Sequence, residues 1–177
     1  MCKKVLTNAF TVPDMGLPTY FLGMHMDHDR AAGKLSLGQR QYVTTILERF
    51  AMEDCNPVRL PIGVGVVMER EGATLDVPMA TKYKKAVGEL LYLATCTRPD
   101  ISFAVGKLSR HVSAPTQAHW AVAKAVMRYL KGTRTWFLTY RSEGPLVGYS
   151  DADYAGDIDT RWSKTGQAFL WGGADFS

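Results

Sequence analysis

The spacing of apolar residues changes twice along the chain, and these changes constrain the fold more than any other feature of the sequence. From residue 20, apolar and polar residues alternate, which is the period of a strand. Between residues 42 and 131, apolar residues recur every three or four positions, as on the buried side of a helix. Alternation returns from residue 135. Strands, then helices, then strands predict an α+β fold.

The first alternating stretch predicts a β-hairpin, preceded by a short helix over residues 2–12. Residues 20–27 are expected to form one strand with a well-buried face, which consists of Tyr20, Leu22, Met24 and Met26. Residues 27–34 are typical of a turn, in which Gly33 is free to adopt a positive φ. Residues 35–37 alternate again and supply the returning strand.

Four amphipathic helices are predicted, over residues 42–52, 81–95, 98–112 and 117–131. Their apolar stripes are Val43, Ile46, Leu47 and Phe50; Val87, Leu90, Leu91 and Ala94; Ile101, Val105, Leu108 and Val112; and Trp120, Ala123, Met127 and Leu130. Thr81 is expected to cap the second helix, and Gly132 to follow the fourth as its C′ residue. Residues 56–81 are rich in proline and glycine, which indicates an extended linker.

The last part of the chain returns to strands, which are expected at residues 136–140, 146–149 and 167–171. The final strand has no following element to cover its edge, and natural domains usually cover or charge such edges. We therefore expect residues 135–177 to be the beginning of a larger domain.

Charge is distributed unevenly and gives the first indication of function. Residues 82–141 carry 11 Lys and Arg but only two acids, Glu89 and Asp100, for a net charge of +9. Residues 1–81 have a net charge of −1, and residues 142–177 one of −4. A folded block of such positive charge attracts polyanions. Nucleic acid is the polyanion that we favour, and a solvated helix face is the alternative.

The candidate nucleic-acid-binding cations lie on the predicted helices. Lys124, Arg128 and Lys131 are spaced by four and three residues, so they share one helix face. Lys107, Arg110 and Arg134 add to this set. Each phosphate neutralised contributes about 0.9 to the slope of log affinity against log salt. No base-reading motif is visible, so binding is expected to follow the backbone.

Composition excludes several classes of protein. Hydrophobic residues make up 46% of the chain, which excludes a disordered polymer. No apolar run approaches the roughly 20 residues that span a bilayer. No secretory signal is expected, because no apolar stretch of about 7–15 residues follows the two lysines near the start. The three cysteines form no CxxC pair. We expect reduced thiols in an intracellular protein, and neither a zinc knuckle nor a disulfide framework.

Few residues suggest chemistry on their own. Gly23 lies inside a predicted strand and marks either a close approach of another backbone or a ligand, or a simple bulge. The acidic stretch 149–159 resembles an EF-hand loop, but Ala155 and Trp162 stand where oxygen ligands are required. Asp151 ends a predicted strand and can hold Mg²⁺ together with other carboxylates. The alternative is an Asp-rich turn whose side chains cap backbone N–H groups.

Several motifs, taken together, resemble the reverse transcriptase of copia-type LTR retrotransposon polyproteins, at the region that leads into RNase H. They lie in the family's order and cover nearly the whole chain. They are YFLGM at 20–24, LSLGQ at 35–39, VGELLYL at 87–93, TRPDI at 97–101, MRYLKGT at 127–133 and GYSDADYAGD at 148–157.

The resemblance implies four segments. Residues 1–55 would be a palm remnant with a primer-contacting hairpin and the first thumb helix, and 56–81 a linker. Residues 82–134 would be the basic helical thumb and connecting region, and 135–177 the first part of an RNase H-like domain. Gly23 would approach the primer, the basic helices would hold the template–primer duplex, and Asp151 would be the first RNase H metal ligand, for Mg²⁺.

The departures from the family concern catalysis. The polymerase Asp-Asp pair occurs nowhere in the chain, and Tyr154 stands where the family usually has Trp. We therefore expect a polyprotein fragment that binds RNA/DNA template–primer. Alone, it is expected to catalyse neither the copying of RNA into DNA nor the cleavage of RNA by RNase H, and to hold no Mg²⁺ stably. The alternatives are a domesticated protein- or RNA-binding module, or a relic without function.

The resemblance and the composition also predict partners and location. The expected partners are the template–primer duplex, the remainder of the polyprotein and, through exposed apolar side chains, a second copy of the chain. No membrane is expected among them. The location would be the cytoplasm or nucleus, and a virus-like particle for the intact family.

Overall fold

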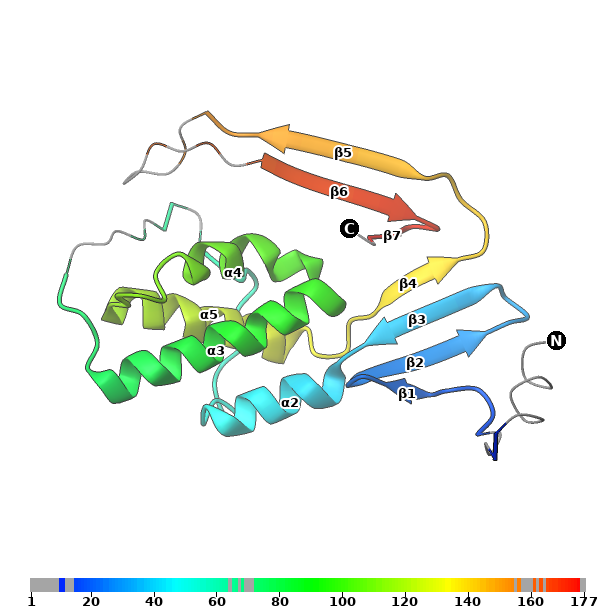
Figure 1. The fold of residues 1–177 in the computed structure, drawn as a ribbon, viewed down its shortest axis with the longest axis horizontal. Coiled ribbons are helices and arrows are strands. Elements are labelled where there is room, and N and C mark those ends of the chain that lie inside the picture. Colours follow the sequence, from blue (N-terminus) through cyan, green and yellow to red (C-terminus); the bar gives the residue numbers. More distant parts are fainter. Residues whose placement is uncertain are drawn as a thin grey trace.

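The computed structural model describes residues 10–11, 15–63, 65–66, 68, 72–154, 156, 161, 163 and 165–175. In these ranges a helical unit lies beside one antiparallel sheet and below a second one (Figure 1). This arrangement confirms the predicted α+β class. The helix predicted over residues 2–12 lies outside the described residues, apart from residues 10 and 11.

The helical unit contains the main core. It consists of α2 (Arg40–Arg49), α3 (Val77–Cys96), a 3-10 turn (Pro99–Ile101), α4 (Ser102–Ser109) and α5 (Gln117–Gly132). All predicted stripe residues are buried except Val112, which is partly buried, and Leu91. Leu91 is 39% exposed, so its placement in the core is wrong. The buried face of α3 centres on Leu90, and Leu91 lies 100° further round the helix.

Two predicted helix ends are also wrong. The predicted cap Thr81 lies inside α3, and the helix begins earlier because Asp76 Oδ1 accepts a hydrogen bond of 3.0 Å from the backbone N–H of Met79. Pro78 does not break the helix, since a proline in the first turn removes no helical hydrogen bond. The end of α5 also differs from the prediction. Gly132, expected just after the helix, is its last residue and has no positive φ.

The first sheet has the order β1 (Tyr20–Phe21), β2 (Met24–Asp29), β3 (Lys34–Gly38) and β4 (Leu138–Arg141). The prediction of one strand over residues 20–27 is wrong, because the chain turns at Leu22 and Gly23, whose φ angles are 47° and 74°. A turn with two positive φ angles matches the twist of a two-residue hairpin.

The predicted buried face of this first strand is not observed either. Of its members, Tyr20 and Leu22 are 56% and 66% exposed, and Met24 and Met26 are only half-buried. Phe21, on the other face, is 56% exposed. Self-association through these apolar side chains stays a prediction.

The turn predicted over residues 27–34 is confirmed with narrower bounds: β2 pairs with β3 across residues 30–33, where Gly33 has a φ of 58°. β4 completes this sheet by pairing with β3, with Lys34 opposite Arg141. The strand at the start of the predicted segment 135–177 thus shares a sheet with strands of the predicted segment 1–55.

The second sheet consists of β5 (Val147–Ala152), β6 (Thr165–Trp171) and β7 (Ala174–Asp175). Hydrogen bonds between described residues join it to the first sheet. The N–H of Arg141 donates to Gly172 O at 3.0 Å, and the Tyr140 hydroxyl donates to Asp175 O at 2.7 Å. Among the described residues, no helix combines the length and apolar character needed to cross a bilayer.

Candidate nucleic-acid interface

The segment between α3 and α4 forms a buried polar clamp. Arg98 is only 3% exposed. Its Nε and Nη2 donate to the two carboxylate oxygens of Asp100, at 2.9 and 2.7 Å. Its Nη1 and Nη2 also donate to the carbonyl and hydroxyl oxygens of Thr133, at 3.1 and 2.5 Å. The TRPD motif therefore fastens the end of α5 to the start of the 3-10 turn.

Aromatic side chains complete this clamp. The Arg98 guanidinium lies 5.6 Å from the centroid of the Tyr129 ring and 5.7 Å from that of Trp136. The Tyr129 hydroxyl donates to Asp100 Oδ2 at 2.8 Å. Burial raises the pKa of Asp100, but the hydrogen bonds and charge of Arg98 outweigh burial, so the net pKa lies below 3.8. Sequence reasoning recognised this motif without predicting its structural role.

Two of the predicted nucleic-acid-binding residues meet in a cavity at the β1–β2 turn, which we call the hairpin cavity. Gly23 lines it from the turn, Arg134 from the chain after α5, and Arg40 from the start of α2. The volume is about 560 Å³. Among the described residues that line it, none is acidic. Its walls are Tyr20, Gly23, His25, Gly38, Gln39, Arg40, Gln41, Thr44, Arg134 and Phe137.

The turn that carries Gly23 is fixed to α3. The Tyr92 hydroxyl donates a hydrogen bond of 2.5 Å to Leu22 O, and the Tyr92 ring lies edge-on to Tyr42 at 5.2 Å. A Cβ added at Gly23 would lie 3.5 Å from the Tyr92 hydroxyl, which is an ordinary contact. Gly23 is therefore required by its φ of 74° rather than by lack of space.

The basic row on α5 is partly occupied by contacts within the chain. Arg128 Nε donates to Asn56 O at 2.6 Å, and Lys131 Nζ donates to Cys55 O at 2.8 Å. These two side chains hold the start of the linker against α5. Lys124 shares with Arg128 a smaller cleft of about 380 Å³, beside Met52.

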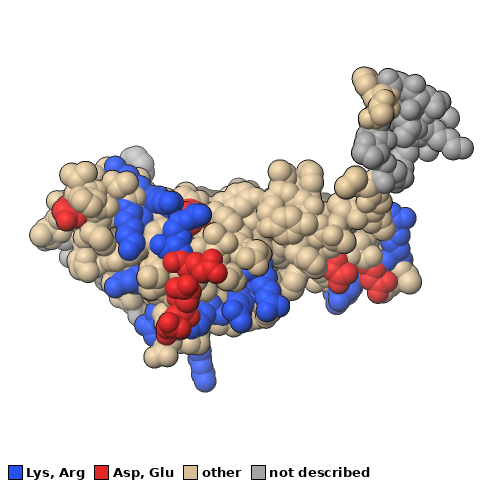
Figure 2. All heavy atoms as spheres, turned by 90° about the horizontal axis from the view of Figure 1, so that it is seen from below, with Lys and Arg blue, Asp and Glu red and all other residues tan. Residues whose placement is uncertain are grey.

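The remaining predicted cations lie on and after α4. Lys107 Nζ lies 4.9 Å from the centroid of the Phe103 ring, a cation–π contact near the surface. Arg110 is exposed just beyond the end of α4. Neither lines the hairpin cavity or the α5 cleft. In the view of Figure 2, Lys and Arg side chains gather over the helical part of the molecule, with some acidic residues among them.

Asp151 lies on β5, exposed and opposite Gly166. Its Oδ1 accepts a hydrogen bond of 2.9 Å from the N–H of Ala152, the next residue on the same strand. Across the described residues, no group of three His, Cys, Asp or Glu is placed to hold a metal ion. Asp151 as an Mg²⁺ ligand of the intact family stays a prediction. Asp157 and Asp159 lie outside the described residues.

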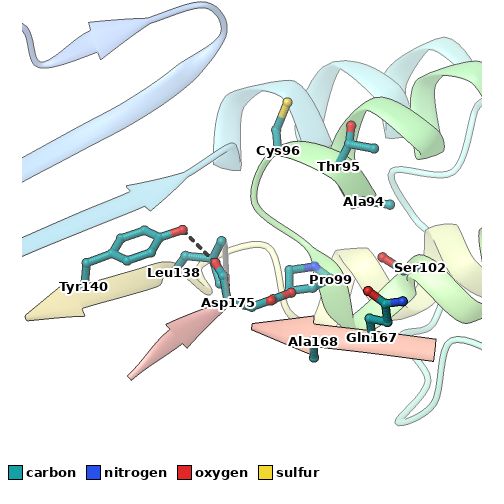
Figure 3. Close-up of a pocket in the computed structure, with 10 residues that line it drawn as sticks. All are labelled: Ala94, Thr95, Cys96, Pro99, Ser102, Leu138, Tyr140, Gln167, Ala168 and Asp175. Atoms are coloured by element: carbon teal, nitrogen blue, oxygen red, sulfur yellow. Dashed lines mark hydrogen bonds between the residues drawn. The ribbon is translucent and has the colours of Figure 1, made fainter. Parts of the chain in front are cut away.

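A further cavity of about 540 Å³ lies where the helical unit meets the second sheet (Figure 3). Cys96 and Ser102 line it from the helical side, and Gln167 and Asp175 from β6 and β7. None of its described lining residues is Lys or Arg. This cavity is therefore less suited to binding an anion than the hairpin cavity is.

Comparison with known proteins identifies relatives over most of the chain. It is 38% identical over 185 aligned positions to a retrovirus-related Pol polyprotein from transposon TNT 1-94 of Nicotiana tabacum, covering 99% of this chain and 14% of that protein. It is 39% identical to that of transposon RE2 of Arabidopsis thaliana, covering 91% and 11%. An uncharacterized mitochondrial protein of Arabidopsis thaliana is 34% identical over 91% of this chain and 66% of its own length. No family model and no solved structure matches.

Proposed function

Because the chain belongs to the copia-type retrotransposon Pol polyproteins, and spans 14% or less of those compared, we propose that it is a part of such a polyprotein that holds template–primer nucleic acid. The resemblance assigns β1–β3 and α2 to the end of the palm and the start of the thumb. It assigns α3–α5 to the thumb and connecting region, and β5–β7 to the opening of RNase H. The remainder of the polyprotein is the expected context of these elements.

The hairpin cavity is the observation that carries this proposal. Three segments far apart in sequence bring the cations Arg40 and Arg134 to the tight turn at Gly23. Tyr20 and Phe137 are 56% and 40% exposed and supply aromatic walls. Arginines bind phosphate oxygens through charge-assisted hydrogen bonds, and aromatic faces pack on sugars and bases. A cationic and aromatic cavity without acids is suited to a nucleic-acid backbone.

The surrounding field favours the same ligand. The block 82–141 carries a net charge of +9, and its cations lie on both α4 and α5. Such a field attracts a polyanion before any contact forms, and salt screens it within about 10 Å at 0.1 M. Lys124 and Lys107 are placed to contribute to this field without base recognition.

The test is a salt titration of binding. A fluorescent RNA–DNA hybrid is titrated with the protein, and its anisotropy is measured between low and physiological salt. Arg134→Gln is expected to weaken binding and to lower the slope of log affinity against log salt by about 0.9, the share of one phosphate contact. Arg59→Gln removes an exposed cation outside the hairpin cavity and is the matched control.

Two results would contradict the proposal. One is the absence of salt-dependent binding by the wild-type chain at low salt, where electrostatic affinity is greatest. The other is an equal effect of the two substitutions, which would show that only net charge matters. Either result would favour a protein-binding module or a relic.

A further inference from the structure

A second cationic cavity lies at the opposite end of the first sheet, and the proposed function does not use it. We call it the sheet-junction cavity, because the β2–β3 turn, β4 and the end of β6 meet there. Its volume is about 650 Å³. Along β2, His25 lines the hairpin cavity and His28 lines the sheet-junction cavity, three positions or roughly 10 Å further along the strand.

Three cations from three places converge on this cavity. Arg30 comes from the turn, Lys34 from β3 and Arg141 from β4. Lys34 and Arg141 are direct cross-strand partners, and like charges in that position destabilise a sheet. Within the described part of the chain, none of the three forms an ion pair, although Asp29 and Glu143 lie nearby in sequence. An anion held between them would relieve this repulsion.

An aromatic wall accompanies the cations. The Trp171 side chain is 49% exposed and lines the cavity from the end of β6. Tyr140 lines it as well, and its hydroxyl is already used by the hydrogen bond to Asp175 O, so the ring remains as an apolar surface. An indole face stacks well on a planar base, but only on a base that is not already stacked within a duplex.

We propose that the sheet-junction cavity binds an unpaired nucleotide, with its phosphate between Lys34 and Arg141 and its base on Trp171. This ligand differs from the duplex assigned to the hairpin cavity. A nucleotide of this kind is either free or part of a single strand, and the chemistry of recognition is the same in both cases.

The experiment uses the full chain and a fluorescent single-stranded oligo(dT), without any duplex. Trp171→Ala is expected to weaken binding by about five-fold or more, the usual loss for one stacked base. The slope of log affinity against log salt should be the same for Trp171→Ala as for wild type. Trp171→Phe keeps an aromatic face and should restore most of the affinity. Lys34→Gln and Arg141→Gln should each lower the salt slope by about 0.7, the value for one phosphate of a single strand.

Controls separate this site from general charge and from the hairpin cavity. Tyr154→Ala removes an aromatic ring that is 95% exposed and lies outside the cavity, and Arg59→Gln removes a distant cation. Competition with unlabelled dTMP distinguishes a free nucleotide, which would displace the oligomer, from a strand, which dTMP would not displace. Equal binding of oligo(dT) by wild type and Trp171→Ala would overturn the inference, even if the RNA–DNA hybrid still binds.

Discussion

Substitution of Arg98 by methionine should destabilise the fold by about 3 kcal/mol. Removing one partner of a buried ion pair usually costs about 3–5 kcal/mol, because the other charge stays buried and unpaired. The Arg98 side chain is 4% exposed, but that of Asp100 is 30% exposed, so water compensates in part and the lower value applies. Methionine keeps most of the apolar stem against Tyr129 and Trp136, so the loss reports mainly on the hydrogen bonds.

The assay is urea unfolding followed by circular dichroism. A loss of this size is a large share of the 5–15 kcal/mol typical of a domain, so Asp100→Asn serves as the milder second variant. The double variant should be more stable than the sum of the single losses predicts, with a coupling energy of at least about 0.5 kcal/mol. Arg59→Met is the exposed control and should change stability by less than about 0.5 kcal/mol. A loss below about 1 kcal/mol for Arg98→Met would refute the reasoning.

The same substitution should also weaken binding of the RNA–DNA hybrid. Thr133, which Arg98 holds at two atoms, directly precedes Arg134 in the hairpin cavity. Arg98 is thus a positioning residue for that cavity. Its effect on the salt slope should resemble that of Arg134→Gln in a variant that is still folded. An unchanged slope would show that Arg98 acts on stability alone.

Two further predictions concern the clamp and the turn. The pKa of Asp100 in the folded chain lies below 3.8, so the stabilisation by its carboxylate is present above that pH and is lost as the pH falls through the folded pKa. As the pH is lowered, the urea midpoint should therefore fall less steeply for Asp100→Asn than for wild type. Parallel curves would contradict this. Gly23→Ala should destabilise by about 1–2 kcal/mol because alanine is strained at a φ of 74°; Gly88→Ala, on an open helix face, should stabilise by about 0.5–1 kcal/mol in the same urea assay.

The helical core was predictable from the sequence because its signal is local and repeated. The stripe on α5, for example, gives four residues on one face, and all four are buried. The beginning of α3 was harder to predict, since a proline marks both linkers and the first turn of helices. The hydrogen bond from Met79 to Asp76 decides between these two possibilities, and only the structure shows it.

The turn at Leu22 and the pairing of β4 were not predictable from periodicity. Leucine rarely adopts a positive φ, so Leu22 gives no local sign of a turn. The residues around it alternate as they would in one continuous strand. The pairing of β3 with β4 joins residues that are about a hundred positions apart, and no local pattern encodes such a contact. The hairpin cavity depends on the turn, and the sheet-junction cavity depends on the pairing of β3 with β4. The sequence therefore contains the residues of both cavities but does not show that the fold brings them together.

Net charge counted along the sequence therefore overstates the contribution of some cations to phosphate binding and understates that of others. Within the block of +9, Arg98 is neutralised by Asp100, and Arg128 and Lys131 are held by backbone carbonyls of residues 55 and 56. Arg40 and Lys34 lie in the nearly neutral first block, yet the fold places them beside Arg134 and Arg141 of the basic block. Phosphate binding requires cations that converge without an acid, so these two pairs should contribute more to affinity than the continuous row on α5.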